Sequence, residues 1–287
     1  MKKPKHVNVL VTKSEKDWLE LKKNTIGGSE ICAILGMNPW TSPFDVWRIK
    51  TGKAEYQEPN MVMKRGKHFE SGLVSLWEEV EGHKVIKSSA KNVLYIDKQY
   101  PFLSVTPDRR FKHKDGGIRT LEAKTTFSRH DEPLDSWVYQ LQWELMFTGD
   151  KYGELVYEYS DPRICYKSMT FESNPEMQKL MKDYAIDWWE TYVVGDVEPP
   201  LVNSNDVLTK FPKETEGKIL EANENIAGIY TEVKRLQDEI KVKDAELETN
   251  KEQMKLFMQD AEKLTYFDEP LCTWKINKNG SRIFRIC

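Results

Sequence analysis

Hydrophobic and polar positions follow two periods along the first two thirds of the chain. Apolar residues at helical spacing predict helices at residues 14–23, 28–35, 42–51, 61–81, 133–148 and 174–194. Alternating or continuous apolar runs predict strands at residues 84–89, 92–97, 102–111, 118–126, 153–159 and 164–171. Helices mixed with strands in this way predict one α/β domain over about residues 1–205.

The pattern then changes to heptad steps, which predict a long helical arm over residues 213–265. Twelve of the fourteen heptad positions are apolar, and Lys243 and Asn250 are the polar pair that would set the register. The fourteen positions are Ile219, Ala222, Ile226, Ile229, Val233, Leu236, Ile240, Lys243, Leu247, Asn250, Met254, Phe257, Ala261 and Leu264. A coiled coil fits this pattern, and a single helix lying back on the α/β domain fits it equally well.

Two alternating segments, 271–276 and 281–286, follow Pro270 and flank a polar turn at 277–280. They predict a terminal β-hairpin over residues 270–287. This tail is basic, because it holds four Lys or Arg and no acidic residue.

Charge is distributed unevenly over a chain whose net charge is only −3. Residues 213–269 carry −6, the tail carries +4, and residues 1–212 are left at −1. A near-neutral domain can still bind DNA if its basic residues line one groove. We expect such a groove from the cations that lie near the motifs described next: Lys22, Lys23, Lys64, Arg65, Lys67, Arg109, Arg110, Lys124 and Arg129.

Composition excludes several classes. No run approaches the roughly 20 apolar residues of a membrane span, and the first residues lack the apolar core of a secretory signal, so we expect a cytoplasmic protein without a membrane partner. The four cysteines, Cys32, Cys165, Cys272 and Cys287, are too scattered for a disulfide framework or a paired-cysteine metal site. We therefore expect no iron–sulfur cluster.

Candidate chemistry lies in Pro107-Asp108 and in Glu122-Ala123-Lys124. Glu122 and Lys124 are two residues apart in a predicted strand, so they share one face. Magnesium is typically held by one or two carboxylates together with substrate phosphate and water, and Asp108 with Glu122 would supply the carboxylates. Lys124 would then position or polarise the attacking water. The two motifs together indicate a metal-dependent nuclease.

The Glu-x-Lys triplet alone is weak evidence, because it recurs at Glu20, Glu216, Glu232 and Glu239, where it is typical of a solvated helix face. The copy at Glu122 differs in its strand context and in the polar turn 112–117, which would fold Asp108 back toward it as a hairpin.

Other residues could complete the site. Glu70 lies in a helical stretch and could add a third acid, and Gln140 and Gln142 follow the catalytic strand on a helix. Because these glutamines are two apart, at most one should reach the site. Upstream, Ile26-Gly27-Gly28-Ser29 predicts a turn into a helix capped by Ser29, whose backbone amides could bind a phosphate or could simply form an ordinary cap.

These motifs together resemble the YqaJ and lambda-exonuclease family of viral recombination nucleases, over roughly residues 15–195. The resemblance implies a PD-(D/E)XK fold, with a mixed central sheet flanked by helices. It also implies that Asp108, Glu122 and the backbone carbonyl of Ala123 hold Mg²⁺, for which Mn²⁺ substitutes, with Glu70 assisting through water or a second metal. Lys124 would activate the water and Gln140 would support the site.

The family's binding site for the DNA 5′-phosphate maps to Lys22 and Ser29. Lysine stands where the family has arginine, so the bidentate contact is lost, and Lys23 or Arg65 could contribute charge. The resemblance further implies a 5′-to-3′ exonuclease from a phage or prophage, acting on the ends of double-stranded DNA. It implies a ring-shaped homo-oligomer and a single-strand annealing partner. The open alternatives are an endonuclease of the same fold and a coiled-coil scaffold with a vestigial site.

Overall fold

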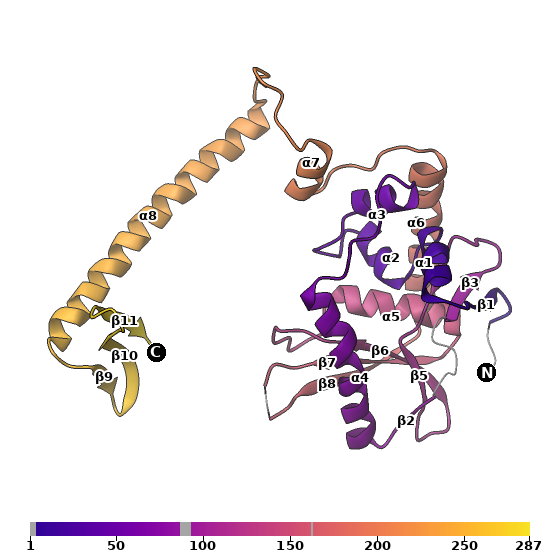
Figure 1. The fold of residues 1–287 in the computed structure, drawn as a ribbon, viewed down its shortest axis with the longest axis horizontal. Coiled ribbons are helices and arrows are strands. Elements are labelled where there is room, and N and C mark those ends of the chain that lie inside the picture. The colour runs from indigo at the N-terminus through magenta and orange to yellow at the C-terminus, as the bar shows by residue number, and fades with distance from the viewer. Residues whose placement is uncertain (1–3, 87–92, 162) are drawn as a thin grey trace. The chain divides into compact units, whose positions relative to one another are not determined.

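The computed structural model describes residues 4–86, 93–161 and 163–287. The chain divides into two units, Met1–Lys213 and Glu214–Cys287 (Figure 1). Parts of two predicted strands, residues 87–89 and residue 92, lie outside the described residues. No helix in the described parts of the chain combines the length and apolarity that a membrane crossing requires.

A five-stranded sheet with the strand order β2-β5-β6-β7-β8 forms the centre of the first unit. Its strands are β2 Lys84–Val85, β5 Arg109–Lys112, β6 Ile118–Lys124, β7 Tyr152–Glu158 and β8 Tyr166–Glu172. β6 and β7 pair in parallel, whereas the other neighbours pair antiparallel. The sheet is therefore mixed, which confirms the predicted α/β class.

Helices cover both faces of this sheet (Figure 1). α4 (Met61–Glu81) packs on one face, in a buried cluster of Leu73, Val74, Trp77, Phe111, Leu121, Ala123 and Val156. α5 (Asp135–Thr148) packs on the other, in a cluster of Leu141, Leu145, Leu155 and Tyr157. Because strand side chains alternate, Glu122 and Lys124 face α5 while Leu121 and Ala123 face α4.

A second layer holds the remaining helices of the first unit and a small sheet with the order β1-β3-β4. These elements are β1 Val7–Val11, α1 Glu15–Lys23, α2 Gly28–Ile34, α3 Pro43–Lys50, β3 Val93–Asp97, β4 Ser104–Val105, α6 Pro175–Trp188, a π-helix Trp189–Val194 and α7 Ser204–Lys210. Their core is rich in aromatic residues, among them Phe44, Trp47, Trp143 and Trp188. The pattern predicted neither β1 nor α7, and it merged α6 with the π-helix.

The strand predicted over 102–111 is wrong as a single element. It splits into β4, which pairs with β3 in the small sheet, and β5, which pairs with β6 in the large one. Pro107 lies in the break, where a residue without a backbone N–H cannot continue a ladder of hydrogen bonds. The break leaves Asp108 at the point where the chain passes from one sheet to the other.

The second unit contains α8 (Glu224–Met258) and a three-stranded sheet, β9 (Lys263–Tyr266), β10 (Glu269–Ile276) and β11 (Arg282–Ile286). The helical arm predicted over 213–265 is too long at both ends. Gln259, with a φ of 46°, ends the helix, and Leu264 lies in β9 rather than in a heptad. The predicted hairpin is present as β10 and β11, but β9 adds a third strand to it.

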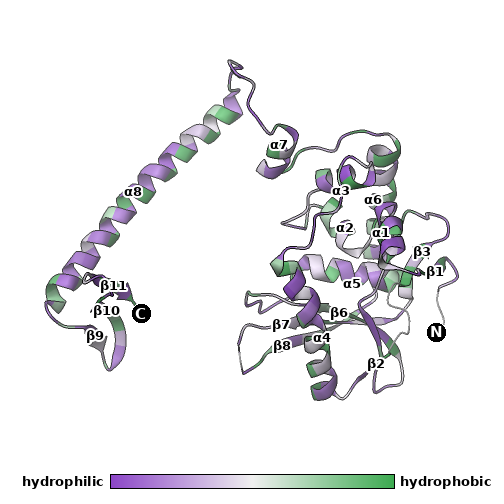
Figure 2. Cartoon of the chain, in the orientation of Figure 1, coloured by the Kyte–Doolittle hydropathy of each residue, from purple (hydrophilic) through white to green (hydrophobic). Residues whose placement is uncertain are grey.

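The heptad positions of α8 are exposed within their own unit. Their side chains are between 43% and 60% exposed at Ile226, Ile229, Val233, Leu236, Ile240 and Leu247. Hydrophilic residues cover most of the rest of the helix (Figure 2). Only its end is buried, where Met258 packs against Cys272 of the sheet. The coiled coil therefore stays a prediction.

Candidate active site

Asp108 is held against β6 by a backbone contact. Its Oδ2 accepts a hydrogen bond from the N–H of Ala123, with an N···O distance of 3.1 Å. The contact follows from the hairpin, because Arg109 pairs with Leu121 and the next position brings Asp108 beside Glu122 and Ala123. The polar turn at 112–117 thus joins the two motifs, as the sequence predicted.

Glu122, Lys124 and Gln140 form a closed triangle on the α5 face of the sheet. Lys124 Nζ lies 2.6 Å from Glu122 Oε1. Gln140 Nε2 donates to the same carboxylate oxygen at 2.7 Å, and Gln140 Oε1 accepts from Lys124 Nζ at 2.8 Å. Glu122 is 1% exposed, so this triangle holds its charge away from bulk water.

Gln142 points elsewhere. Its amide donates to the carbonyl of Glu172 at 2.9 Å and accepts from the N–H of Asn174 at 2.9 Å. Gln178 donates to it as well, at 3.1 Å. One of the two glutamines therefore reaches the site, and the other fastens α5 to the segment that enters α6.

Glu70 reaches the same region from α4. Its Oε1 lies 3.2 Å from Nη2 of Arg109, the residue that follows Asp108. Burial raises the pKa of Glu70 despite the Arg109 charge, and the negative charge of Glu122 adds to this effect. Three elements, α4, β5 with its preceding loop, and β6, thus place three carboxylates within range of electrostatic interaction.

Glu144 is a fourth carboxylate, which no sequence motif indicated. It lies on α5 four residues after Gln140, so both occupy one face of the helix, and it is 0% exposed. Among the residues that the structure describes, neither oxygen of Glu144 nor Oε2 of Glu122 meets an N–H or hydroxyl donor. Burial, followed by the Glu122 charge, raises the pKa of Glu144 well above its ordinary value. These effects favour the protonated form of Glu144 beside Glu122.

The charges of the cluster constrain one another. Burial raises the pKa of Asp108 well above its ordinary value, and the charges of Glu122 and Glu70 act in the same direction. Burial would also raise the pKa of Glu122, but the Lys124 charge and hydrogen bonds lower it overall. Burial would lower the pKa of Lys124, yet the Glu122 and Asp108 charges raise it. Lys124 and Glu122 are thus an ion pair. In the neighbouring acids, burial and like charge favour the protonated form, an effect that a bound cation would oppose.

The oxygen atoms at this site fit a hard divalent cation that takes only one or two of its ligands from the protein. Within the described residues, no three His, Cys, Asp or Glu side chains form a ready metal-binding group. Magnesium does not need one, because one or two carboxylates suffice when substrate phosphate and water fill the other positions. Asp108 and Glu122 supply those carboxylates, and Glu122 keeps a buried oxygen, Oε2, without an N–H or hydroxyl donor among the described side chains and backbone.

The start of α2 lies against this cluster. A side chain at Gly28 would bring its Cβ 3.1 Å from Cγ of Gln140, so any other residue would require Gln140 to shift by a few tenths of an ångström. The predicted cap by Ser29 is wrong, since Gly27 is the N-cap and its N–H donates to Glu30 at 2.9 Å. Ser29 is instead an exposed residue in the first turn. Glu30 is fixed in turn by Lys50, at 2.7 Å.

Several cations expected in the basic groove are already paired. Arg65 forms a two-point contact with Glu158, and Arg110 is buried against Asp150. Lys23 lies 2.6 Å from Glu55. Lys22 lies over the rings of Trp18 and Tyr56, with its Nζ 5.2 Å and 5.6 Å from their centroids. Lys22 lies on α1 and Ser29 on α2, and α2 borders the site at Gly28. Arg65 and Arg110 are each paired with a carboxylate.

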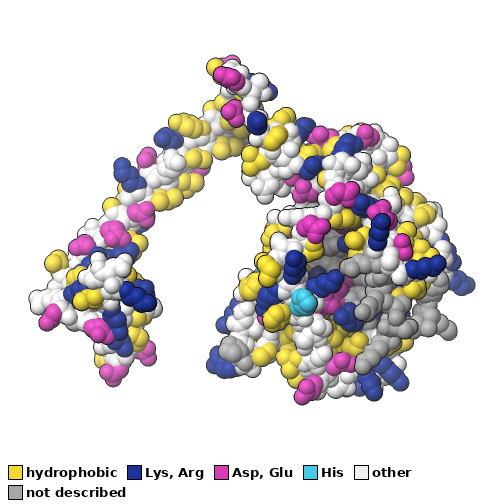
Figure 3. All heavy atoms as spheres, in the orientation of Figure 1, with side chains coloured by type: hydrophobic (Ala, Val, Ile, Leu, Met, Phe, Trp, Pro, Cys, Tyr) yellow, Lys and Arg dark blue, Asp and Glu magenta, His cyan; other side chains and the backbone are white. Residues whose placement is uncertain are grey.

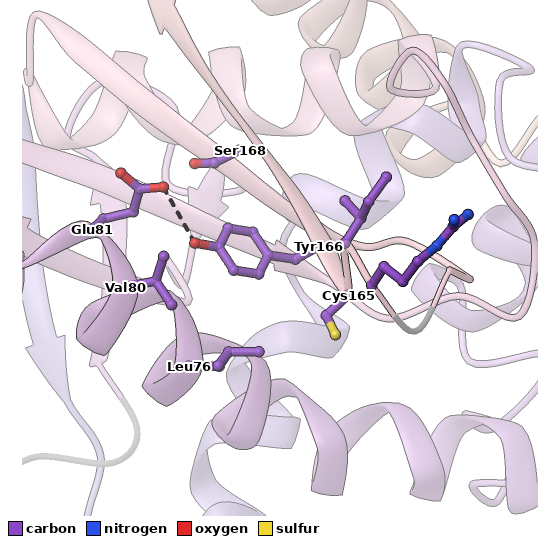
Figure 4. Close-up of a pocket in the computed structure, with 8 residues that line it drawn as sticks. Leu76, Val80, Glu81, Cys165, Tyr166 and Ser168 are labelled. Atoms are coloured by element: carbon purple, nitrogen blue, oxygen red, sulfur yellow. Dashed lines mark hydrogen bonds between the residues drawn. The ribbon is translucent and has the colours of Figure 1, made fainter.

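A separate pocket of about 490 Å³ lies between α4 and the start of β8. Figure 4 shows its lining, with the Tyr166 hydroxyl bonded to Glu81 at 3.2 Å. Leu76, Val80 and Cys165 complete the labelled apolar wall. None of the clustered carboxylates lines it, so this hollow is not the candidate active site.

Several known proteins are similar to this chain. Residues 17–151 match the family model of the YqaJ-like viral recombinase domain. The uncharacterized protein YqaJ of Bacillus subtilis (strain 168) is 27% identical over 274 residues, which cover 90% of this chain and 83% of that protein. The alkaline exonuclease LHK-Exo from Laribacter hongkongensis is similar in structure, with a TM-score of 0.50 at 13% identity over 63% of this chain and 93% of that one.

The crystal structure of LHK-Exo in complex with dAMP gives the same TM-score of 0.50, at 12% identity. At such low identity the likeness shows a shared fold, in which a central mixed sheet is flanked by helices. Over residues 17–151 the chain is similar to the YqaJ-like viral recombinase domain family.

Proposed function

We propose that this protein is a Mg²⁺-dependent 5′-to-3′ exonuclease that digests linear double-stranded DNA and leaves 3′ single strands for annealing recombination. The observation that carries the proposal is the convergence of Asp108, Glu122, Lys124 and Gln140 at the end of β6. The first unit would be the nuclease, with the catalytic face of a PD-(D/E)XK enzyme. The 5′-to-3′ polarity rests on the resemblance of the motifs to the exonuclease family.

Asp108 and Glu122 would hold the metal, together with the backbone carbonyl of Ala123, and Glu70 would act through water or a second metal. A bound Mg²⁺ or Mn²⁺ neutralises charge on the phosphate and lowers the pKa of bound water. Lys124 is cationic, so it would hold and polarise the attacking water rather than remove its proton. Gln140 would keep Lys124 and Glu122 in position, because it bonds to both.

Lys22 and Ser29 would bind the DNA 5′-phosphate, with Lys23 adding charge. Their positions support this assignment. α2 begins against Gln140, and α1 ends shortly before α2 in the sequence. Lysine binds phosphate as a point charge without the two-point geometry of arginine. We therefore expect a weaker preference for a 5′-phosphate than an arginine would give.

The second unit would act in assembly. The exposed heptad side chains of α8 would join copies of the chain into the oligomer or recruit a single-strand annealing protein. The basic strands β10 and β11 would face DNA. These roles are part of the proposal, and the nuclease activity of the first unit does not depend on them.

The test is digestion of linear duplex DNA labelled separately at each end, beside a covalently closed circle, with and without Mg²⁺. Ordered loss from the 5′ ends with an intact circle supports the proposal. Asp108→Asn should be inactive, whereas Asp183→Asn, which changes an exposed surface pair with Lys179, should behave as wild type. Cutting of the circle would identify an endonuclease, and full activity of Asp108→Asn would refute the metal assignment.

A further inference from the structure

Two exposed aromatic rings lie beside the candidate active site with an arginine between them. Phe69 of α4 is 57% exposed, and Phe127, in the loop after β6, is 66% exposed. The guanidinium carbon of Arg65 lies 4.6 Å from the centroid of the first ring and 4.2 Å from that of the second. These three residues are called the aromatic clamp below. Other aromatic rings of this chain are equally exposed, but these two lie next to Glu70 and close after Lys124 in the sequence and share one arginine.

Hydrogen bonds to Glu158 and Ser160 fix the position of the clamp. Arg65 contacts both carboxylate oxygens of Glu158, at 2.9 Å and 3.2 Å, and Glu158 also accepts from the N–H of Thr126 at 3.1 Å. The hydroxyl of Ser160 donates to the carbonyl of Phe127 at 3.1 Å. α4 and the loop are therefore both fastened to the end of β7, and the two rings are preorganised before any ligand binds.

The same contacts determine what the clamp can bind. Glu158 neutralises the Arg65 charge, so the clamp has little attraction for phosphate. The guanidinium covers part of each ring, and the exposed fractions leave the remaining faces open. A flat, apolar and neutral surface of this kind fits a nucleobase, because every base has a π-face that stacks on aromatic rings.

The clamp also lies at a fixed distance from the catalytic residues. Phe127 is three residues after Lys124, which limits their Cα separation to about 10 Å. Arg65 precedes Glu70 by five residues of helix, or about 7.5 Å along its axis. At about 3.4 Å per nucleotide of a duplex strand, these distances span two or three nucleotides. Figure 3 shows basic and hydrophobic side chains side by side on this face of the first unit, over α4.

We propose that the aromatic clamp stacks on an unpaired nucleobase of the DNA, within about three nucleotides of the scissile phosphate. This inference rests on the proposed function and adds to it a base-stacking subsite. By holding one base out of the duplex, the clamp would keep the end of the strand open while the phosphate reaches Asp108 and Glu122. Arg65 acts as a positioning residue for the two rings.

The test uses the full-length protein and short duplexes that carry 2-aminopurine at one of the first four positions from either end. Ca²⁺ replaces Mg²⁺ so that binding is measured with little hydrolysis. The variants are Phe127→Ala and Phe69→Ala, with Phe127→Trp to restore a stacking ring. Phe211→Ala is the matched control, since Phe211 is 56% exposed with Lys210 over its ring at 5.4 Å, on α7.

We expect wild type to change the 2-aminopurine fluorescence at one or two positions near the end. Phe127→Ala and Phe69→Ala should lose this signal and bind about five- to 150-fold more weakly, the range for loss of one stacked base. Phe127→Trp should retain both, and Phe211→Ala should match wild type. Both alanine variants change exposed side chains, so they should fold.

If wild type cuts and binds DNA but both alanine variants bind equally well with an unchanged signal, the inference fails and the proposed function stands. The rings would then brace α4 or meet a protein. If wild type neither binds nor cuts duplex DNA, the proposed function fails, and the inference fails with it.

Discussion

Gln140 is neutral, yet its loss should impair catalysis strongly while leaving the fold intact. Gln140→Met keeps the approximate shape and removes the amide, so the bonds to Glu122 at 2.7 Å and from Lys124 at 2.8 Å are lost. Both bonds involve a charged partner. Partners that orient a metal-binding carboxylate typically contribute 10- to 100-fold to affinity or rate, equivalent to about 1.4–2.7 kcal/mol. We expect a rate loss of that size at saturating Mg²⁺.

Gln142→Met is the matched control on the same helix. It removes three hydrogen bonds, to Glu172, Asn174 and Gln178, so we expect it to lower the free energy of unfolding by about 2–4 kcal/mol. Its turnover should stay within twofold of wild type below its melting temperature. The assays are nucleotide release from end-labelled duplex and thermal unfolding. Equal rate losses in the two variants, or a fully active Gln140→Met, would refute the assignment of Gln140 to the site.

Three further predictions follow from the same structure. Lys124→Met should lower the rate by about 10²–10³-fold, which is the typical loss when one donor that stabilises charge in the transition state is removed. The affinity for DNA, measured in Ca²⁺, should change little. Glu144→Gln should keep a hydrogen-bond donor to Glu122 and stay active, whereas Glu144→Leu should slow digestion about tenfold or more. Equal activities of the two variants would contradict a role of Glu144 as a donor to Glu122. Burial acts to raise the pKa of Asp97, but Lys182 at 2.6 Å and backbone N–H groups lower it overall. The ionised Asp97 therefore stabilises the fold fully above its pKa in the unfolded chain, and this stabilisation is lost as the pH falls through its pKa in the folded protein. Asp97→Asn should accordingly lower the melting temperature at pH 7, and the melting temperatures of the variant and wild type should converge in acid.

Local patterns were enough to predict the elements that carry the catalytic motifs. β6 and α4 lie where alternation and helical spacing place them, and the turn between β5 and β6 brings Asp108 to Ala123. These features depend on contacts between residues close in sequence. The patterns mispredicted the strand over residues 102–111, because Pro107 interrupts it and divides the run between two sheets.

The sequence by itself determined the α/β class, the hairpin and the shared face of Glu122 and Lys124. These follow from local features: the helical and strand periods, a polar turn, and the two-residue period of a strand. Only the tertiary structure decided that Gln140 rather than Gln142 meets them, and that Glu144 lies behind Glu122. It also decided that Arg65 is neutralised by Glu158. The rotation of α5 against β6 and the packing of α4 depend on side chains distant in sequence. A local period contains no information about which of those side chains will meet.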